Sequence, residues 1–353
     1  MQVQMLVATA ALGAAVSFSA QSAVAQARDA RITSEPGETH LSNIRQLTFG
    51  GQNAEAYWSG DGQWITMQSS LPGMACDQQF VMRADGSDLH RISNGRGKTT
   101  CGWFIPGTNR LLFASSSAHD STCPPRPDPS RGYVWPLDKF DLYTVGRDGS
   151  DLKRLTNYNT YTAESVVSPD GKHIVFTSLK DGDLDIYVMN IDGTNVKRLT
   201  NTPGYDGGPW WSPDGTKIVY RSHHPSDSTE LAQYNALLRD GLVRPSKVEL
   251  FVMNADGSDQ RQITHLGGAN FGPSWTVDGR RIIFASNYKN PRSRNFDLFL
   301  VNPDGSGLEQ ITTHAEFDGF PMFSPDGRKV MWASNRNGKE AGETNIFVAD
   351  WRP

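Results

Sequence analysis

A repeated unit of short strands and tight turns is the feature of this 353-residue chain that most constrains its fold. Each unit has an apolar strand, a turn of the Ser-Pro-Asp-Gly type, two further apolar strands, an Asp-Gly turn and a closing Arg-x-Leu-Thr strand. Asp-Gly pairs between apolar runs favour tight hairpins, because glycine accepts the positive φ angle that these turns require. The first turn occurs six times, in a degenerate form at the second copy, and begins at Ser59, Ile105, Ser168, Ser212, Thr276 and Ser324.

The closing strand is out of step with the rest of the repeat. Its first copy, Arg45–Thr48, precedes every turn, whereas the last unit stops after its third strand, Asn345–Trp351. A circular array needs this arrangement to close on itself, and closure removes the exposed sheet edges that promote aggregation. The sequence therefore predicts an all-β fold: a six-bladed β-propeller of four-stranded antiparallel blades, in which the N-terminal strand completes the last blade.

Two of the units resemble a known family. The segments 211–220 (WSPDGTKIVY) and 250–257 (LFVMNADG) are similar to the WD-like Pro-Asp repeats of TolB, a periplasmic propeller family, and the resemblance covers roughly residues 41–351. It implies the propeller fold but says little about activity, because blades of this kind carry unrelated functions. The chain departs from TolB in leaving no room before Leu41 for the separate N-terminal α/β domain of that family.

The N-terminal 27 residues are interpreted as a secretory signal peptide. Their apolar centre, residues 5–20, ends in small residues and is shorter than the roughly 20 apolar residues of a membrane span, although the usual basic residues are missing. We expect residues 28–40 to be a linker, residues 41–353 to be the propeller, and the protein to be periplasmic or secreted and not membrane-spanning. In such a compartment Cys76, Cys101 and Cys123 predict one disulfide, with the pairing left open.

Two insertions mark the face on which a site is expected. They cover residues 115–140 in the second unit and 222–249 in the fourth, and both lie on the face opposite the Ser-Pro-Asp-Gly turns. Variable loops on a constant scaffold are typical of a functional surface. Residues 230–239 have apolar side chains at helical spacing, which predicts a short helix over the channel mouth. The Pro-rich first insertion is predicted to form a wall of the same mouth.

Polar residues six positions before each first turn are the candidate ligand-binding residues of the channel. They are Asn53, Thr99, Thr162, Asp206, Asn270 and Asp318, together with Tyr234 of the predicted helix. The competing interpretation is that any propeller channel is wet and polar. Imidazole groups can bind divalent metals, so the candidate metal ligands of the same face are His223, His224, His265 and His314. No close ligand spacing supports them, and a structural role is the alternative; no other cofactor is expected.

The sequence gives no signature of a known catalytic site. It has no G-x-S-x-G elbow, phosphate-binding loop or dinucleotide fingerprint, and we assign no catalytic residue. The net charge of −4, without a long basic run, excludes nucleic acid as an expected partner. We expect a monomeric, non-enzymatic protein- or glycan-binding or scaffolding module, whose loop-rich face takes a protein terminus, a peptide or a polysaccharide end. The alternative is a metal-assisted polysaccharide lyase or hydrolase that uses the histidines.

Overall fold

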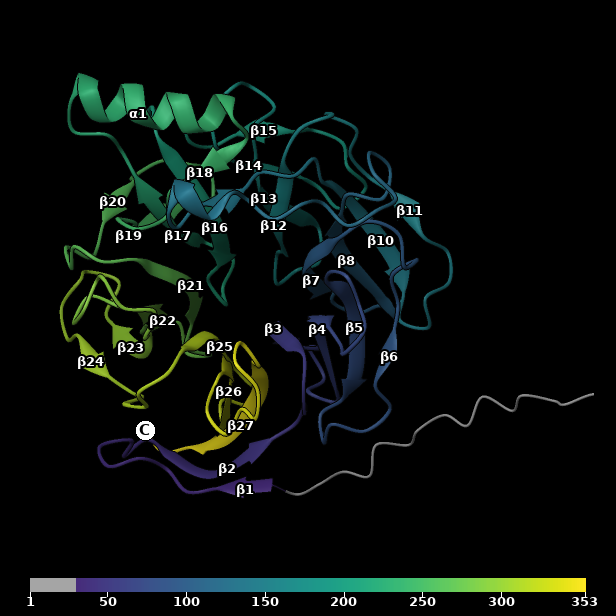
Figure 1. Ribbon diagram of the computed structural model, residues 1–353, viewed down its shortest axis with the longest axis vertical. Helices are drawn as coiled ribbons and strands as arrows, with labels where there is room; N and C mark the ends of the chain where they lie inside the picture. Colours follow the sequence, from purple (N-terminus) through teal and green to yellow (C-terminus); the bar gives the residue numbers. More distant parts are fainter. Residues whose placement is uncertain (1–29) are drawn as a thin grey trace, which may run out of the picture.

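The computed structural model describes residues 30–353 of the chain. The predicted signal peptide, residues 1–27, lies outside the described residues. Six sheets stand in a ring around a central axis (Figure 1), which confirms the predicted six-bladed propeller. The first strand of each blade is the innermost one, and successive strands follow outward.

The blades are made of the following strands. Blade I contains β3 (Gln52–Trp58), β4 (Trp64–Ser70), β5 (Gln78–Arg83) and β6 (His90–Arg91). Blade II contains β7 (Thr99–Phe104), β8 (Arg110–Ser115), β10 (Asp141–Gly146) and β11 (Lys153–Arg154). Blade III contains β12 (Thr162–Val167), β13 (His173–Ser178), β14 (Asp185–Asn190) and β15 (Lys197–Arg198). Blade IV contains β16 (Tyr205–Trp211), β17 (Lys217–His223), β19 (Glu249–Asn254) and β20 (Arg261–Gln262). Blade V contains β21 (Asn270–Trp275), β22 (Ile282–Ser286), β23 (Asp297–Val301) and β24 (Glu309–Gln310). Blade VI contains β25 (Asp318–Phe323), β26 (Lys329–Ser334), β27 (Asn345–Trp351), β2 (Leu41–Gln46) and β1 (Ala30–Ile32).

Apolar side chains fill the spaces between neighbouring blades. Between blades III and IV, Val175 and Ile186 pack with Ile218 and Tyr220, and all four are fully buried. β-branched and aromatic residues favour strands that are covered on both faces. Most second strands therefore contain a short apolar run, such as Ile218–Tyr220 in β17.

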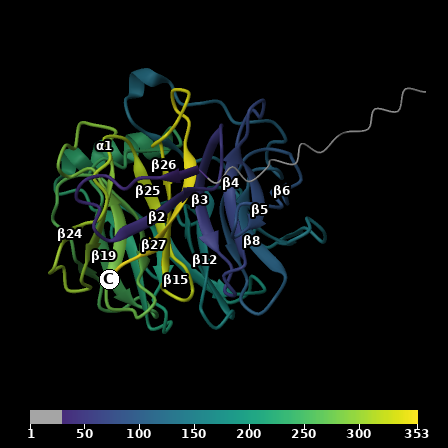
Figure 2. The same ribbon diagram turned by 90° about the horizontal axis from the view of Figure 1, so that it is seen from below.

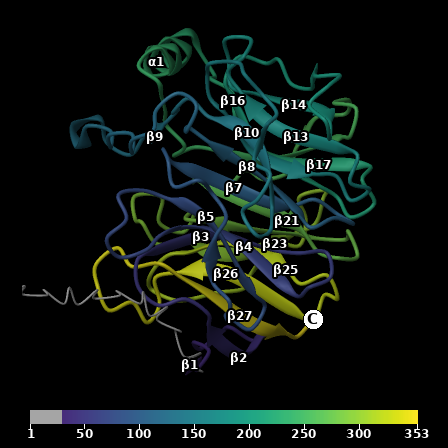
Figure 3. The same cartoon turned by 90° about the vertical axis from the view of Figure 1, so that its right-hand side faces the viewer.

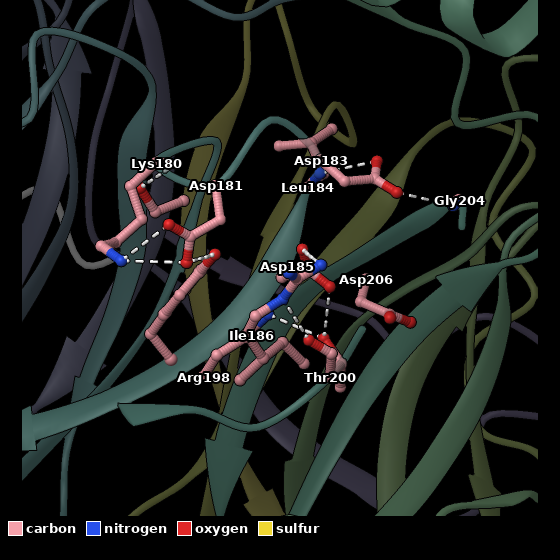
Figure 4. A network of polar contacts seen from close by, with 12 residues as sticks. Lys180, Asp181, Asp183, Leu184, Asp185, Ile186, Arg198, Thr200, Gly204 and Asp206 are labelled. Atoms are coloured by element: carbon pink, nitrogen blue, oxygen red, sulfur yellow. Dashed lines mark hydrogen bonds and ion pairs between the residues drawn. The ribbon is translucent and has the colours of Figure 1, made fainter. Parts of the chain in front are cut away.

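The Arg-x-Leu-Thr motif fastens each two-residue fourth strand to the third strand. In blade III the Thr200 hydroxyl accepts a hydrogen bond from the Ile186 amide at 3.0 Å and donates one to Asp185 at 3.2 Å (Figure 4). Arg198 pairs with the same carboxylate at 2.6 Å. In each of the other five blades, the corresponding hydroxyl accepts a hydrogen bond from a backbone amide of the third strand. These hydroxyls belong to Thr48, Ser93, Thr156, Thr264 and Thr312.

The same kind of hydrogen bond closes the ring of blades by joining the two ends of the described chain. β2 pairs antiparallel with β27, and the Thr48 hydroxyl accepts from the Ile346 amide at 2.9 Å and donates to Asn345 at 3.1 Å. The N-terminal strand therefore completes the last blade, as the sequence predicts.

The segment before β2 differs from the sequence prediction. β1 pairs with β2 on its outer side, so β2 is not the outermost strand, and part of the expected linker 28–40 is a fifth strand of blade VI. Glu38 of the same segment is buried and pairs with Arg336 at 2.9 Å. Arg336 also pairs with Asp318 at 2.8 Å. Strand pairing and a buried ion pair therefore attach this segment to the propeller.

The two insertions meet on the face opposite the Ser-Pro-Asp-Gly turns. The blade II insertion holds the short 3₁₀ helix η1 (Pro129–Arg131) and β9 (Trp135–Pro136), while the blade IV insertion holds α1 (Ser228–Arg239) and β18 (Leu242–Val243). β9 and β18 form a two-stranded antiparallel sheet of their own. Figures 2 and 3 show α1 on one side of the ring, and Figure 3 places β9 on that same side.

The helix predicted over residues 230–239 is confirmed and begins two residues earlier. Asp227 caps it by accepting hydrogen bonds from the amides of Thr229 and Glu230, both at 2.8 Å. Within residues 30–353, no helix is long and apolar enough to span a bilayer.

Candidate functional site

A cavity of about 380 Å³ opens within the propeller channel beneath the two insertions. Its walls come from the innermost strands and from β9, and they combine aromatic rings with a few charged groups. A volume of this size is within the range of small-molecule sites, which is roughly 300–1,000 Å³. We call it the loop-face cavity.

Six equivalent residues, one from each innermost strand, form its central ring. Each lies four positions before the first turn of its blade and has a φ angle between 49° and 59°; they are Glu55, Cys101, Glu164, Gly208, Gly272 and Phe320. A β-bulge occurs here in every blade, because the register to the second strand shifts at this point. Left-handed backbone is uncommon for residues other than glycine, and such outliers cluster at functional sites.

Fixed partners surround the Glu164 carboxylate. Its carboxylate accepts a hydrogen bond from the Gly208 amide at 2.8 Å and forms an ion pair with Arg221. Arg221 also donates to the Tyr205 hydroxyl at 2.6 Å. A Cβ atom at Gly208 would lie 2.3 Å from the Arg221 guanidinium, so the absence of a side chain there lets Arg221 reach the channel. The nearby Glu164 carboxylate raises the pKa of Arg221 and keeps it charged.

Glu55 occupies the equivalent position in blade I but has no such counter-charge. Among residues 30–353 no ion pair reaches its carboxylate, and its hydrogen-bond partner is the Cys101 thiol. Loss of hydration in the channel, with a smaller contribution from the neighbouring Glu164, raises the pKa of Glu55 to about 7. The two equivalent carboxylates therefore differ in their partners: Glu164 pairs with Arg221, whereas Glu55 has no ion pair among the described residues.

Aromatic rings close the cavity below and cover it above. Tyr57, Trp103 and Trp210 touch one another with ring centroids 4.7–5.4 Å apart and separate the loop-face cavity from a second hollow at the turn face. Above, the Trp135 indole donates to the Tyr133 hydroxyl at 3.0 Å and lies 5.1 Å from the Arg221 guanidinium. The cavity therefore has a floor and a partial cover rather than being an open pore.

The polar ring predicted from the sequence lies two residues before the ring that lines the cavity. All six of its members are fully buried: Asn53, Thr99, Thr162, Asp206, Asn270 and Asp318. Most of their polar groups bond within the propeller; for example, Thr162 bonds to Ser178 at 2.9 Å. Among the described residues, Asp206 Oδ2 and Asn270 Oδ1 have no hydrogen-bond partner. Tyr234 is also buried, and its hydroxyl oxygen lies 2.5 Å from the Asp183 carboxylate and 2.8 Å from the Gly204 carbonyl, the two acceptors of its one hydrogen, which anchors α1. A ligand-binding role for these seven residues stays a prediction.

The four candidate histidines do not form a shared centre. His223 contacts Glu230 at 3.2 Å, and His224 contacts Asp206 at 3.1 Å. His265 contacts Gln262 at 2.9 Å, and His314 accepts the Glu316 amide at 3.1 Å. In the part of the chain that the structure describes, no three His, Cys, Asp or Glu residues are placed so that they could hold a metal ion. Metal binding by the histidines stays a prediction without a matching geometry.

The three cysteines are free thiols in this structure, and two of them are neighbours. The Cys123 thiol donates to the Ala75 carbonyl at 3.2 Å, and the Cys76 thiol donates to the Gly97 carbonyl at 3.3 Å. Burial and the adjacent Cys123 thiol raise the pKa of Cys76 to about 12. Cys101 is buried beside Glu55, and burial raises the pKa of its thiol well above its usual value.

Sequence comparison finds short regions of similarity. The family described as the Tricorn protease N-terminal beta propeller domain matches residues 137–246. Dipeptidyl-peptidase 5 of Porphyromonas gingivalis is 37% identical over 62 residues, which is 18% of this chain and 9% of that protein.

Comparison with solved structures extends over most of the chain. A putative TolB from Agrobacterium tumefaciens aligns with a TM-score of 0.54 and 18% identity, covering 86% of this chain and 91% of that one. TolB from Acinetobacter baumannii gives 0.53 and 17%, covering 86% and 64%. A gluconolactonase from Xanthomonas campestris gives 0.55 and 14%, covering 91% and 94%. Identities this low show the fold alone. The chain therefore has the TolB-like six-bladed β-propeller fold.

Proposed function

We propose that this chain is a non-enzymatic periplasmic binding protein whose loop-face cavity holds the end of a protein or peptide partner. The observation that carries the proposal is the shape of the cavity, with an aromatic floor below and the Tyr133–Trp135 cover above. Such a space accepts a chain end, since a continuous chain would need an exit through the floor.

The lining favours a peptide over a polysaccharide end. A sugar presents many hydroxyl groups, and each one that enters a cavity needs a hydrogen-bond partner. Here several polar groups of the lining are already used within the protein: Arg221 bonds to Glu164 and Tyr205, and Gln68 accepts from Thr100. The rest of the wall is mainly aromatic, as in sites that anchor apolar side chains.

The test is affinity selection with mass-spectrometric readout. The purified chain is incubated with a library of random pentapeptide amides and, separately, with oligomers of N-acetylglucosamine and of galacturonate. We expect retention of pentapeptides and at least a tenfold loss of their affinity in Trp135→Ala, because buried aromatic anchors carry much of the binding energy.

The matched control is Phe49→Ala, which removes an exposed aromatic ring away from the loop-face cavity. It should bind as the unaltered protein does. Retention of the sugar oligomers alone, or equal retention by Trp135→Ala, would overturn the proposal.

A further inference from the structure

The loop-face cavity is lined by two carboxylates, those of Glu55 and Asp77, that no ion pair among residues 30–353 neutralises; Asp77 accepts a hydrogen bond from the Ser70 hydroxyl at 2.6 Å. Glu55 and Glu164 lie at equivalent bulge positions of blades I and III, and both line the cavity. Arg221 neutralises Glu164, whereas in the described chain no ion pair reaches Glu55.

The groups that face Glu55 from neighbouring elements do not supply the missing charge. Cys101 of β7 donates its thiol, Glu164 of β12 and Asp77 before β5 add negative charge, and Arg221 of β17 is committed to Glu164. Tyr57, on its own strand, carries a neutral phenol whose pKa is raised by burial. Glu55 is half-buried, and a carboxylate that has lost part of its hydration without gaining a counter-charge is costly. A bound cation would relieve that cost.

We propose that the occupant of this cavity presents a free amino terminus, whose ammonium group pairs with the carboxylate of Glu55. The inference rests on the proposed function and specifies which end of the peptide enters. The surrounding rings add to the attraction, since aromatic faces favour cations; Tyr57, Tyr161 and Trp135 all line the cavity. A carboxyl terminus would instead face the carboxylates of Glu55, Asp77 and Glu164. The two cations of the lining, Arg221 and Lys98, already pair with Glu164 and Asp138.

The pairing has a defined dependence on pH. Glu55 must be ionised to bind an ammonium group, and its pKa in the free protein is about 7. The apparent affinity follows the ionised fraction, so it should rise about fivefold between pH 6 and pH 7. Above pH 8 it should fall again, because an α-amino group loses its proton with a pKa near 8, roughly 7.7–8.0. Binding below pH 7 should also release a proton.

The experiment compares pentapeptide amides that have free amino termini with the same peptides after N-acetylation. The three best-retained members of the library are titrated calorimetrically into the full chain at pH 6, 7 and 9. We expect N-acetylation to weaken binding at least tenfold, and Glu55→Gln to weaken it similarly and abolish the rise between pH 6 and 7.

Glu316→Gln is the matched control, because it removes an equal charge from an exposed site on the loop face without altering the cavity lining. It should preserve both affinity and pH profile. If acetylated and free peptides bind equally well, the ammonium assignment is wrong while the peptide-binding function stands. If neither form binds, the proposed function itself fails. The acetylation comparison uses the unaltered protein, so it decides the matter even if Glu55→Gln folds poorly.

Discussion

Closure of the ring by Thr48 gives the sharpest prediction about stability. Thr48→Val keeps the shape of the side chain but removes the hydroxyl that serves the Ile346 amide at 2.9 Å and Asn345 at 3.1 Å. Thr48 is 5% exposed, so water cannot replace these bonds. An unsatisfied buried group costs about 1–3 kcal/mol. We therefore expect a loss of about 2 kcal/mol in the free energy of blade VI opening.

Hydrogen exchange followed by mass spectrometry measures this locally. A loss of about 2 kcal/mol corresponds to roughly 30-fold faster exchange of the amides in residues 41–48 and 345–351. Thr200→Val is the matched control, since Thr200 makes the same two contacts in blade III at 3.0 and 3.2 Å. In Thr200→Val, the exchange of residues 41–48 and 345–351 should match that of the unaltered protein. Unchanged exchange of 345–351 in Thr48→Val would refute the closure argument.

Two further predictions concern pH and redox state. The carboxyls of Glu55, Asp185 and Asp297 have raised pKa values of about 7, 6 and 7, so the folded state binds extra protons and urea stability should increase as pH falls from 8 to about 5. Below about pH 4 stability should decrease, because hydrogen bonds in the turns hold the pKa of each turn aspartate below its usual value. These residues are Asp61, Asp85, Asp148, Asp170, Asp192, Asp214, Asp256, Asp278, Asp304 and Asp326. Stability that is flat from pH 8 to pH 3 would contradict both statements. With oxidised glutathione as the oxidant, Cys76 and Cys123 should form the single disulfide while buried Cys101 stays reduced, and non-reducing peptide mapping that finds Cys101 in the bridge would show the pairing to be wrong.

The propeller could be predicted from the sequence because its signals are local and repeated. In each Ser-Pro-Asp-Gly turn the serine bonds to the aspartate two residues later, as Ser168 does to Asp170 at 2.6 Å. The Arg-x-Leu-Thr strand is equally local, since Thr200 reaches the strand that immediately precedes it. β1 could not be recognised in the same way, because three residues paired at the edge of blade VI leave no periodic pattern.

The cavity lining was harder to identify, for a geometric reason. Strand alternation treats positions six and four before a turn as equivalent, but a bulge begins at position four and breaks that equivalence. Asn53 is therefore fully buried, while Glu55 lines the cavity. Across the six blades the lining position changes from Glu to Cys, Gly or Phe, so it lacks the shared residue type that made the turns visible. This variation, at one position of an otherwise regular repeat, is the sequence signal that could have identified the cavity lining. The contact between β9 and β18 joins distant insertions and follows from no local pattern.

The most direct test of the account is to locate the bound peptide on the propeller. Hydrogen exchange of the full chain with and without a retained pentapeptide amide should show protection at residues 133–137, 161–166 and 208–210, which cover or line the loop-face cavity. Residues 59–63 and 168–172 on the opposite face should be unchanged. Protection confined to those turns, with none around the cavity, would contradict the central claim that the inserted loops and the channel beneath them form the binding site.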